Sequence, residues 1–385
     1  MPWKETAPVQ ERAEFVRLAE SGRYGFSQLC ELFGISRKTG YKRLRLYRQL
    51  GREGLADQSR AAHTHPNATP KEICRQIIRI REKYPEWGPE KILDYLRAHE
   101  PDKPWPASST AGEILDREGL IHKRRRRART VTPEKPRIET PRAPNELWNI
   151  DLMGWFRTGD GQKCHTLTAT DSFSRALLLC KGLLRPTHAD TLAGLEACFK
   201  QYGLPLAIRC DNGEPFISYR SVGGLSRLSV WLIKLGIRQV RTRPGHPQDN
   251  GLHERMHRTI RSKAARPPAN SLAAEQPRLN AIRRVYNCVR PHRALAGKTP
   301  MSLYQASERR FPRRLPRLEY PKHFEVRKVR ANGDLVWKSN LLFLSEVLAR
   351  EPVGLEETDD GIWSMYVGPL MIAILDERRR RIISK

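Results

Sequence analysis

Residues 147–154 have the sequence LWNIDLMG, in which one carboxylate, that of Asp151, is flanked by apolar side chains. Such a run of apolar and aromatic residues predicts a buried β-strand. A carboxylate within it is costly to bury unless a partner meets it. We therefore expect Asp151 to lie where other functional groups converge.

The segments that follow alternate between strand and helix patterns. We predict strands at Lys163–Thr170, Ala176–Lys181 and Pro205–Cys210, and helices at Thr187–Tyr202, Ser221–Leu235 and Asn250–Ala264. Strands followed by alternating helix and strand indicate an α/β core with a mixed sheet flanked by helices. We assign this core to residues 145–310.

Two further acidic residues are predicted to lie at the same end of the sheet. Asp211 comes directly after a predicted strand, and Asn212-Gly213 then turns the chain. Asp211 should therefore lie beside the middle of the sheet, where Asp151 also points. Glu254 falls on a predicted helix, from which it can lean back toward both aspartates.

Three converging carboxylates fit the chemistry of phosphodiester cleavage or transfer. That reaction needs an activated oxygen nucleophile, a stabilised leaving oxygen and charge neutralisation, which two divalent cations about 4 Å apart supply. Mg²⁺ is a hard ion that takes oxygen ligands, and we expect Mn²⁺ to substitute for it. We predict that Asp151, Asp211 and Glu254 are the catalytic residues and the metal ligands.

The sequences around these acids resemble the acidic motifs of integrase-core insertion-sequence transposases. The motifs are Trp148-x-x-Asp151, Cys210-Asp211-Asn212-Gly213 and, at residues 244–255, PGHPQ-x-NG-x-x-ER. The resemblance implies a ribonuclease-H-like core, shared with retroviral integrases, that cleaves DNA and transfers the cut strand to a target. It also implies double-stranded DNA partners, namely transposon-end inverted repeats and target DNA, and a dimer or larger homo-oligomer on paired ends.

The spacing of the acids departs from the family pattern at one place. Asp151 and Asp211 are separated by 59 residues, room for two strands, a helix and the return strand. The 42 residues between Asp211 and Glu254 exceed the usual spacing, and we assign the excess to residues 218–229. The departure concerns the geometry of this loop rather than the triad.

The composition predicts a polyanionic partner. Lys and Arg number 70 against 42 Asp and Glu, which gives a net charge of +28. Neutralising phosphates with Lys and Arg releases counterions and supplies most non-specific affinity for nucleic acid. No signal-peptide pattern and no apolar run of membrane-spanning length occurs, so we expect a cytoplasmic, nucleoid-associated bacterial protein. No P-loop motif occurs, and the participation of a helper ATPase is left open.

Two N-terminal all-α helix-turn-helix domains are predicted, at residues 1–62 and 63–122. In the first, Gly34 interrupts a helical pattern and Ser36 can cap the next helix. That helix would present basic and hydrogen-bonding side chains to a major groove, namely Arg37, Lys38, Thr39, Tyr41, Lys42 and Arg43. The alternatives are a solvated basic helix for the first domain and a spacer or dimerisation element for the second.

Further DNA contacts are predicted outside these domains. Residues 123–144 combine four prolines with a basic run, the composition of an extended linker that either tracks phosphates or is a solvated tether; the run is Arg124, Arg125, Arg126 and Arg127. Arg258 and Arg261 follow Glu254 by four and seven residues, so they share its helical face and either hold DNA or form a basic stripe without function. His246 and His253 are interpreted as loop, DNA-facing or exposed positions.

The chain is predicted to end in a small β-barrel-like domain at residues 320–385. Asn332-Gly333 and Asp360-Gly361 are typical hairpin turns between β-rich runs.

Three other functions compete with the transposase hypothesis. Residues 253–257, HERMH, fit the H-E-x-x-H motif of zinc metalloproteases, in which the glutamate is the general base. A protease leaves the predicted DNA-binding domains and the charge of +28 unexplained. A catalytically silent DNA-binding regulator and a nuclease that cuts without joining would both keep the same fold.

Overall fold

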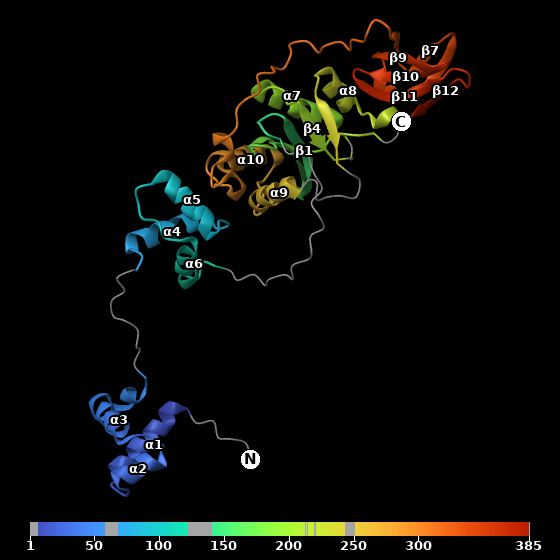
Figure 1. Cartoon of the computed structure of the whole chain (residues 1–385). Coiled ribbons are helices and arrows are strands. Elements are labelled where there is room, and N and C mark those ends of the chain that lie inside the picture. Colours follow the sequence, from blue (N-terminus) through green and yellow to red (C-terminus); the bar gives the residue numbers. More distant parts are fainter. Residues whose placement is uncertain are drawn as a thin grey trace. The chain divides into compact units, whose positions relative to one another are not determined.

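A computed structural model describes residues 7–57, 68–121, 141–211, 213, 215–218, 221–242 and 251–384, apart from the side chain of Leu252. The chain divides into two compact units, Met1–Thr69 and Pro70–Lys385 (Figure 1). Within the described ranges, every helix is too short or too polar to span a bilayer. The five domain boundaries drawn from the sequence stay predictions.

The first unit is a three-helix domain. Its helices are α1 (Pro8–Glu20), α2 (Phe26–Leu32) and α3 (Arg37–Leu50), followed by a 3₁₀ turn at Gly51–Leu55. They enclose a core of Phe15, Val16, Leu29, Cys30, Leu44 and Leu55. The turn between α2 and α3 contains Gly34 at φ +62°, a conformation that glycine adopts without strain. Ser36 accepts a hydrogen bond from the backbone N–H of Thr39, which confirms the predicted cap of α3.

A second helical group opens the second unit. It consists of α4 (Lys71–Lys83), α5 (Pro89–His99) and α6 (Ser108–Arg117), with Trp87, Ile92 and Leu93 completely buried between them. Pro89 starts α5, where its missing N–H costs no helical hydrogen bond. Val285 and Val289 pack against this core, and Glu86 pairs with Lys263 at 2.7 Å. The group is therefore attached to the α/β core by apolar and ionic contacts.

The α/β core contains a five-stranded mixed sheet. Its strands are β1 (Leu147–Arg157), β2 (Lys163–Asp171), β3 (Leu177–Leu183), β4 (Ala207–Cys210) and β5 (Arg238–Arg241), in the order β3-β2-β1-β4-β5. β1, β2 and β3 pair antiparallel, whereas β1, β4 and β5 pair parallel. This topology confirms the predicted ribonuclease-H-like mixed sheet.

Helices cover the sheet on both faces. They are α7 (His188–Tyr202), α8 (Arg227–Lys234), α9 (Gly251–Ala264) and α10 (Leu272–Cys288). Trp148 and Ile150 of β1 pack with side chains of α7 and α8, and Met153 packs with side chains of α9 and α10. Successive strand residues point to opposite faces, so Asp151 points to the α9 side.

The predicted helix at Ser221–Leu235 is wrong in its first turns. Residues Val222–Gly224 form a 3₁₀ turn in which Gly223 and Gly224 have positive φ, and α8 begins only after its cap, Ser226. Glycines in this conformation interrupt an α-helix. The turn instead contacts the C-terminal domain, since Val222 packs on its core and Ser221 Oγ lies 2.8 Å from Ser345 Oγ.

The C-terminal domain is an antiparallel, barrel-like β structure. Its strands are β6 (Glu325–Lys328), β7 (Asp334–Trp337), β8 (Asn340–Phe343), β9 (Pro352–Asp359), β10 (Ile362–Val367), β11 (Leu370–Asp376) and β12 (Arg381–Ser384). Five of them form a sheet in the order β12-β11-β10-β9-β6, and the β7-β8 hairpin lies against both of its edge strands. The predicted turn at Asp360-Gly361 joins β9 to β10, with Gly361 at φ +71°.

Three short 3₁₀ turns complete the described elements. Two of them follow α10, at Arg293–Leu295 and Pro300–Ser302, and the third lies in the C-terminal domain at Glu346–Leu348.

Candidate active site

Asp151 lies in the middle of β1, opposite Thr168 of β2. Its side chain is 18% exposed, and its Oδ1 accepts a hydrogen bond from the backbone N–H of Leu152 at 2.8 Å. A carboxylate held in this way on the central strand of a sheet has a fixed position. It is accessible only from the side of the sheet that α9 covers.

The other two predicted acids come from neighbouring elements. Asp211 directly follows β4, which runs parallel to β1, and its Oδ1 accepts a hydrogen bond from the backbone N–H of Gly213 at 3.3 Å. Glu254 is exposed in the first turn of α9. Burial, most strongly, and the negative charges of Asp211 and Glu254 together raise the pKa of Asp151 to about 7, against the opposing effect of the Leu152 hydrogen bond. The three carboxylates therefore interact electrostatically.

The histidines of α9 form a buried hydrogen-bond network with threonines of β2. His253 is 2% exposed, with Nε2 2.8 Å from Thr168 Oγ1 and Nδ1 3.1 Å from Thr170 Oγ1. The interpretation of His253 as an exposed or DNA-facing residue is therefore wrong. Its neighbours on β2 are far away in the sequence, so nothing local to the helix showed that it would be buried.

His257 extends this network to Asp151. Its Nε2 also lies 2.8 Å from Thr168 Oγ1, and its Nδ1 lies 3.9 Å from Asp151 Oδ2. Burial lowers the pKa of His257 to about 4, so the ring is neutral at neutral pH. His257, Thr168 and Thr170 were not predicted from the sequence to be site residues. The available signal was the i, i+4 spacing of the two histidines, which places both on one helical face.

The same contacts bear on the H-E-x-x-H motif. Ligand atoms of Asp151, His253 and His257 all lie within 4.8 Å of one another. Both ring nitrogens of His253, however, already meet threonine hydroxyls, and Glu254 is exposed rather than aimed at the pair. A zinc protease needs both imidazoles as ligands and the glutamate beside the ion. The arrangement does not match that requirement.

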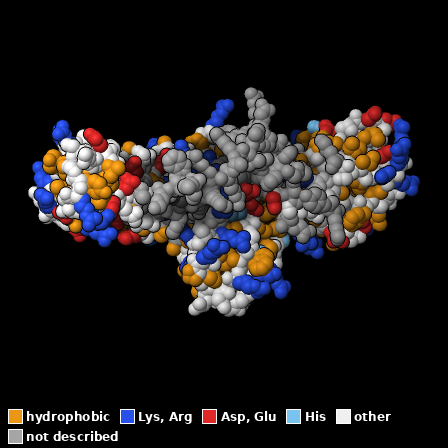
Figure 2. Space-filling model, turned by 90° about the horizontal axis from the view of Figure 1, so that it is seen from below, with side chains coloured by type: hydrophobic (Ala, Val, Ile, Leu, Met, Phe, Trp, Pro, Cys, Tyr) orange, Lys and Arg blue, Asp and Glu red, His pale blue; other side chains and the backbone are white. Residues whose placement is uncertain are grey.

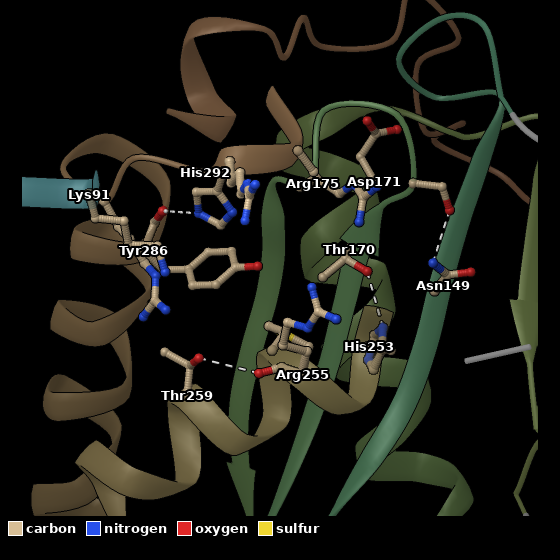
Figure 3. A pocket seen from close by; sticks show the side chains of 15 residues that line it. Lys91, Asn149, Thr170, Asp171, Arg175, His253, Arg255, Thr259, Tyr286 and His292 are labelled. Atoms are coloured by element: carbon tan, nitrogen blue, oxygen red, sulfur yellow. Dashed lines mark hydrogen bonds between the residues drawn. The ribbon is translucent and has the colours of Figure 1, made fainter. Parts of the chain in front are cut away.

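A basic pocket lies behind this network, between α9, α10 and the turn after β2 (Figure 3). It has a volume of about 140 Å³, and its cationic lining residues are Lys91, Arg175, Arg255, Arg290 and Arg293. Nη1 of Arg290 is buried without a hydrogen-bond partner in the described part of the chain. The one carboxylate in the lining, Asp171, already accepts hydrogen bonds from Asn145 and Ser174. The pocket thus has an excess of positive charge and suits an anion.

The predicted DNA-contact residues fall into three groups. Most of those on α3 are exposed, as the hypothesis needs: Arg37, Lys38, Thr39, Tyr41 and Lys42. Arg43 instead pairs with Asp57 at 2.7 Å and has a side chain only 17% exposed. Arg258 and Arg261 are exposed on α9, and Arg261 donates to the Trp155 carbonyl of β1. The remaining residues, Arg124–Arg127 and His246, lie outside the described ranges.

Basic side chains are also widespread on the surface. Figure 2 shows Lys and Arg side chains spread over the coloured parts of the face that it draws. Beside Arg261, the exposed indole of Trp155 has Lys163 Nζ 4.6 Å and the Arg157 guanidinium 5.7 Å from its ring. An aromatic ring flanked by cations is suited to contact with nucleic acid.

Family comparisons agree with this architecture. An integrase core domain family matches residues 141–247, and a second family of the same description matches residues 235–300. Residues 141–300 of the chain thus match integrase core domain families. Ahead of the integrase core, a helix-turn-helix domain family matches residues 11–63 and a homeodomain-like family matches residues 39–115. The motif resemblance is thereby confirmed.

Two relatives of this chain are encoded by insertion elements. It is 23% identical over 310 residues to an uncharacterized 39.2 kDa protein of insertion element IS476 from Xanthomonas euvesicatoria, covering 80% of each chain. It is 29% identical over 182 residues to an uncharacterized 31.7 kDa protein of insertion element IS407 from Burkholderia multivorans, covering 46% of this chain and 61% of that one. The integrase catalytic core of HTLV-2 in complex with magnesium matches 43% of this chain and 99% of its own, at 20% identity and a TM-score of 0.34.

Proposed function

We propose that this integrase-core protein is a DNA transposase that cleaves strands at transposon ends and joins them to target DNA. The observation that carries the proposal is the convergence of three carboxylates from β1, the end of β4 and α9, where burial and then the charges of Asp211 and Glu254 raise the pKa of Asp151 to about 7. We assign Asp151, Asp211 and Glu254 as the ligands of Mg²⁺, with Mn²⁺ as a substitute.

The donor set fits a hard divalent cation. Carboxylates that repel one another are a site in which a bound cation removes an unfavourable interaction. Oxygen ligands from two or three carboxylates suffice for Mg²⁺, which keeps several waters. When bound, a pair of such ions would supply charge neutralisation and activation of an oxygen nucleophile in phosphodiester chemistry.

The protein's own residues hold this site and its substrate. The Leu152 and Gly213 backbone N–H groups orient the carboxylates of Asp151 and Asp211. Arg258 and Arg261 are exposed on the helix of Glu254, in position for phosphate contacts beside the carboxylates. The basic pocket and the ring of Trp155 supply further anion-binding and stacking surface. Together these groups would position the DNA strand for attack.

The helix-turn-helix domain supports the proposal that the protein binds DNA of a specific sequence. Exposed side chains of α3 would read the inverted repeats, while phosphate contacts would fix the register. A transposase must handle two ends together, so we propose a dimer or larger homo-oligomer on paired ends. Mass photometry of the DNA-bound protein would reject this assembly if each paired-end complex held a single chain.

The deciding experiment is a gel assay with labelled DNA that carries the repeats flanking the gene, in Mg²⁺ or Mn²⁺. We expect the wild-type protein to nick and join this DNA and Asp211→Asn to bind it without either reaction. Asp102→Asn, a change at an exposed acid far along the sequence from the triad, is the matched control and should retain both reactions. Cleavage without joining would indicate a nuclease. Binding without any reaction by the wild-type protein would indicate a regulator.

A further inference from the structure

The inference concerns the nitrogen of His257 that faces Asp151, and it rests on the proposed metal site. Nδ1 of His257 and Oδ2 of Asp151 are 3.9 Å apart, too far for a hydrogen bond. Two ligand atoms that share one cation at about 2.1 Å each are separated by up to about 4.2 Å. The separation lies within this limit, so both atoms can reach one ion.

The hydrogen bonds around Thr168 determine which nitrogen of His257 carries its proton. The Thr168 hydroxyl has one hydrogen and two lone pairs, and its oxygen makes three contacts. It lies 3.0 Å from the Asp151 carbonyl, which can only accept, and 2.8 Å from Nε2 of both His253 and His257. All three contacts are hydrogen bonds only if the hydroxyl donates to the carbonyl and both Nε2–H groups donate to the hydroxyl.

This proton arrangement separates the two histidines. His253 then has Nδ1 free to accept from the Thr170 hydroxyl at 3.1 Å, so both of its nitrogens are occupied. His257 has no such second partner among the described residues. Its Nδ1 presents an unshared electron pair toward Asp151 Oδ2, so two acceptors face each other across 3.9 Å with no proton between them.

The surrounding side chains fix the ring of His257 in this orientation. Its ring meets that of His253 edge to face, with centroids 4.6 Å apart. Its Nε2–H donates to Thr168, and a ligating histidine almost always donates its second ring N–H to such an acceptor. The His257 side chain is 13% exposed. The ligand atom is thus held in place before a cation arrives.

We propose that Nδ1 of His257 is a further metal ligand, which binds the same cation as Asp151 and gives the carboxylate site one nitrogen donor. Imidazole favours first-row transition metals, whereas Mg²⁺ takes oxygen ligands. The site therefore prefers Mn²⁺ to Mg²⁺ more strongly than three carboxylates alone would. His253 and Thr168 are positioning residues for this ligand.

The direct test is pulsed electron paramagnetic resonance of Mn²⁺ bound to the full chain. A coordinated imidazole couples its ¹⁴N nucleus to the Mn²⁺ electron spin, so we expect ¹⁴N modulation in the wild-type protein. His257→Asn should abolish that modulation, because an amide oxygen can occupy the position of Nδ1. His323→Asn changes an exposed histidine of the C-terminal domain and should leave it unchanged.

Titration of Mn²⁺ and Mg²⁺ into the same proteins gives a second readout. His257→Asn should reduce the ratio of Mn²⁺ to Mg²⁺ affinity by at least about tenfold. His257→Gln keeps a group that reaches Thr168 but places no donor at Nδ1, so it should weaken Mn²⁺ binding. Far-ultraviolet circular dichroism of each variant checks that it is folded.

The outcomes separate this inference from the proposed function. Bound Mn²⁺ without ¹⁴N modulation, or modulation that survives in His257→Asn, overturns the ligand assignment. If Asp151→Asn still abolishes Mn²⁺ binding in that case, the proposed carboxylate site stands. If wild-type protein binds no Mn²⁺, or if Asp151→Asn and Asp211→Asn bind it as well as the wild type, the proposed metal site fails together with this inference.

Discussion

The two faces of the paired strands β1 and β2 differ in chemistry although the same two strands form both faces. Toward α7 and α8 the strands present apolar groups, among them Trp148, Ile150 and Leu167, all buried. Toward α9 they present polar groups that are almost as buried: Asn149, Asp151, Thr168 and Thr170. Both faces exclude water, but only one does so with side chains that gain free energy from burial.

The difference shows which face of the sheet contributes less to stability because it carries the candidate active site. On the apolar face, burial and packing are favourable at every position. On the polar face, Thr168 and Thr170 keep their hydrogen bonds only because α9 supplies His253 and His257. Asp151 keeps its negative charge at a cost, since burial and neighbouring carboxylates oppose it. The apolar face should therefore dominate stability and the polar face should dominate reactivity.

The largest expected effect on stability comes from the apolar face. Trp148→Ala removes a side chain with no exposed surface and should lower the free energy of unfolding by about 3–5 kcal/mol. Trp155→Ala, at a 43% exposed tryptophan of the same strand, is the control and should change it by less than about 1 kcal/mol. Urea denaturation measures both. Equal losses would contradict the assignment of the core to the α7 and α8 side.

Removing the charge of Asp151 should stabilise the protein relative to the wild type, and this gain in stability should grow as the pH rises. The pKa of Asp151 is about 7 in the folded chain and about 3.9 when unfolded, so between these values the folded state binds more protons. Wild-type stability contributed by this group therefore falls as pH increases from about 4 to 7. Without divalent metal, Asp151→Asn should exceed the wild type by a few kcal/mol at pH 8, on the order of 3, and by much less at pH 5.

Thermal unfolding in a chelator at several pH values measures this difference. His257, whose pKa burial lowers to about 4, contributes stability that is lost as pH falls from about 6.5 toward 4. Comparing the two proteins at each pH cancels that contribution. A difference in melting temperature that stays constant from pH 5 to pH 8 would mean that Asp151 is not destabilised by its surroundings.

The smallest expected effect on stability comes from the hydroxyl that joins both histidines to β2. Thr168→Val leaves two buried imidazole N–H groups without an acceptor and should cost about 1–3 kcal/mol. It should also reduce strand joining by about 10- to 100-fold, because His257 loses its orientation. Thr191→Val is the control, since that buried hydroxyl on α7 has no partner in the described structure and its loss should cost nothing measurable. Joining that is unaffected by Thr168→Val would separate the network from catalysis.

The sequence predicted the elements whose patterns are local. The strands at β1 to β4 and the helices α7 and α9 have apolar residues at the right period, and the structure contains them within a few residues of the expected bounds. β5 was not predicted because RQVR, at Arg238–Arg241, is a polar edge strand without a buried face. α10 was not predicted because Pro277 lies inside it, where proline usually ends a helix.

The parts of the site that depend on tertiary contacts were not predictable in this way. The motifs indicated Asp151, Asp211 and Glu254 as candidate site residues, because each acid lies in a recognisable run of adjacent residues. The burial of His253 is decided by Thr168 and Thr170, which lie more than 80 positions earlier. The ion pair of Arg43 likewise depends on Asp57, which lies after the helix that carries Arg43.

The turn at residues 222–224 lies in the long interval between Asp211 and Glu254, and it contacts another domain. Val222 and Leu225 belong to the apolar core of the C-terminal domain, and the Gly223 N–H donates to Ser384 Oγ at 3.2 Å. Part of the interval between the second and third acids therefore binds the C-terminal domain to the α/β core.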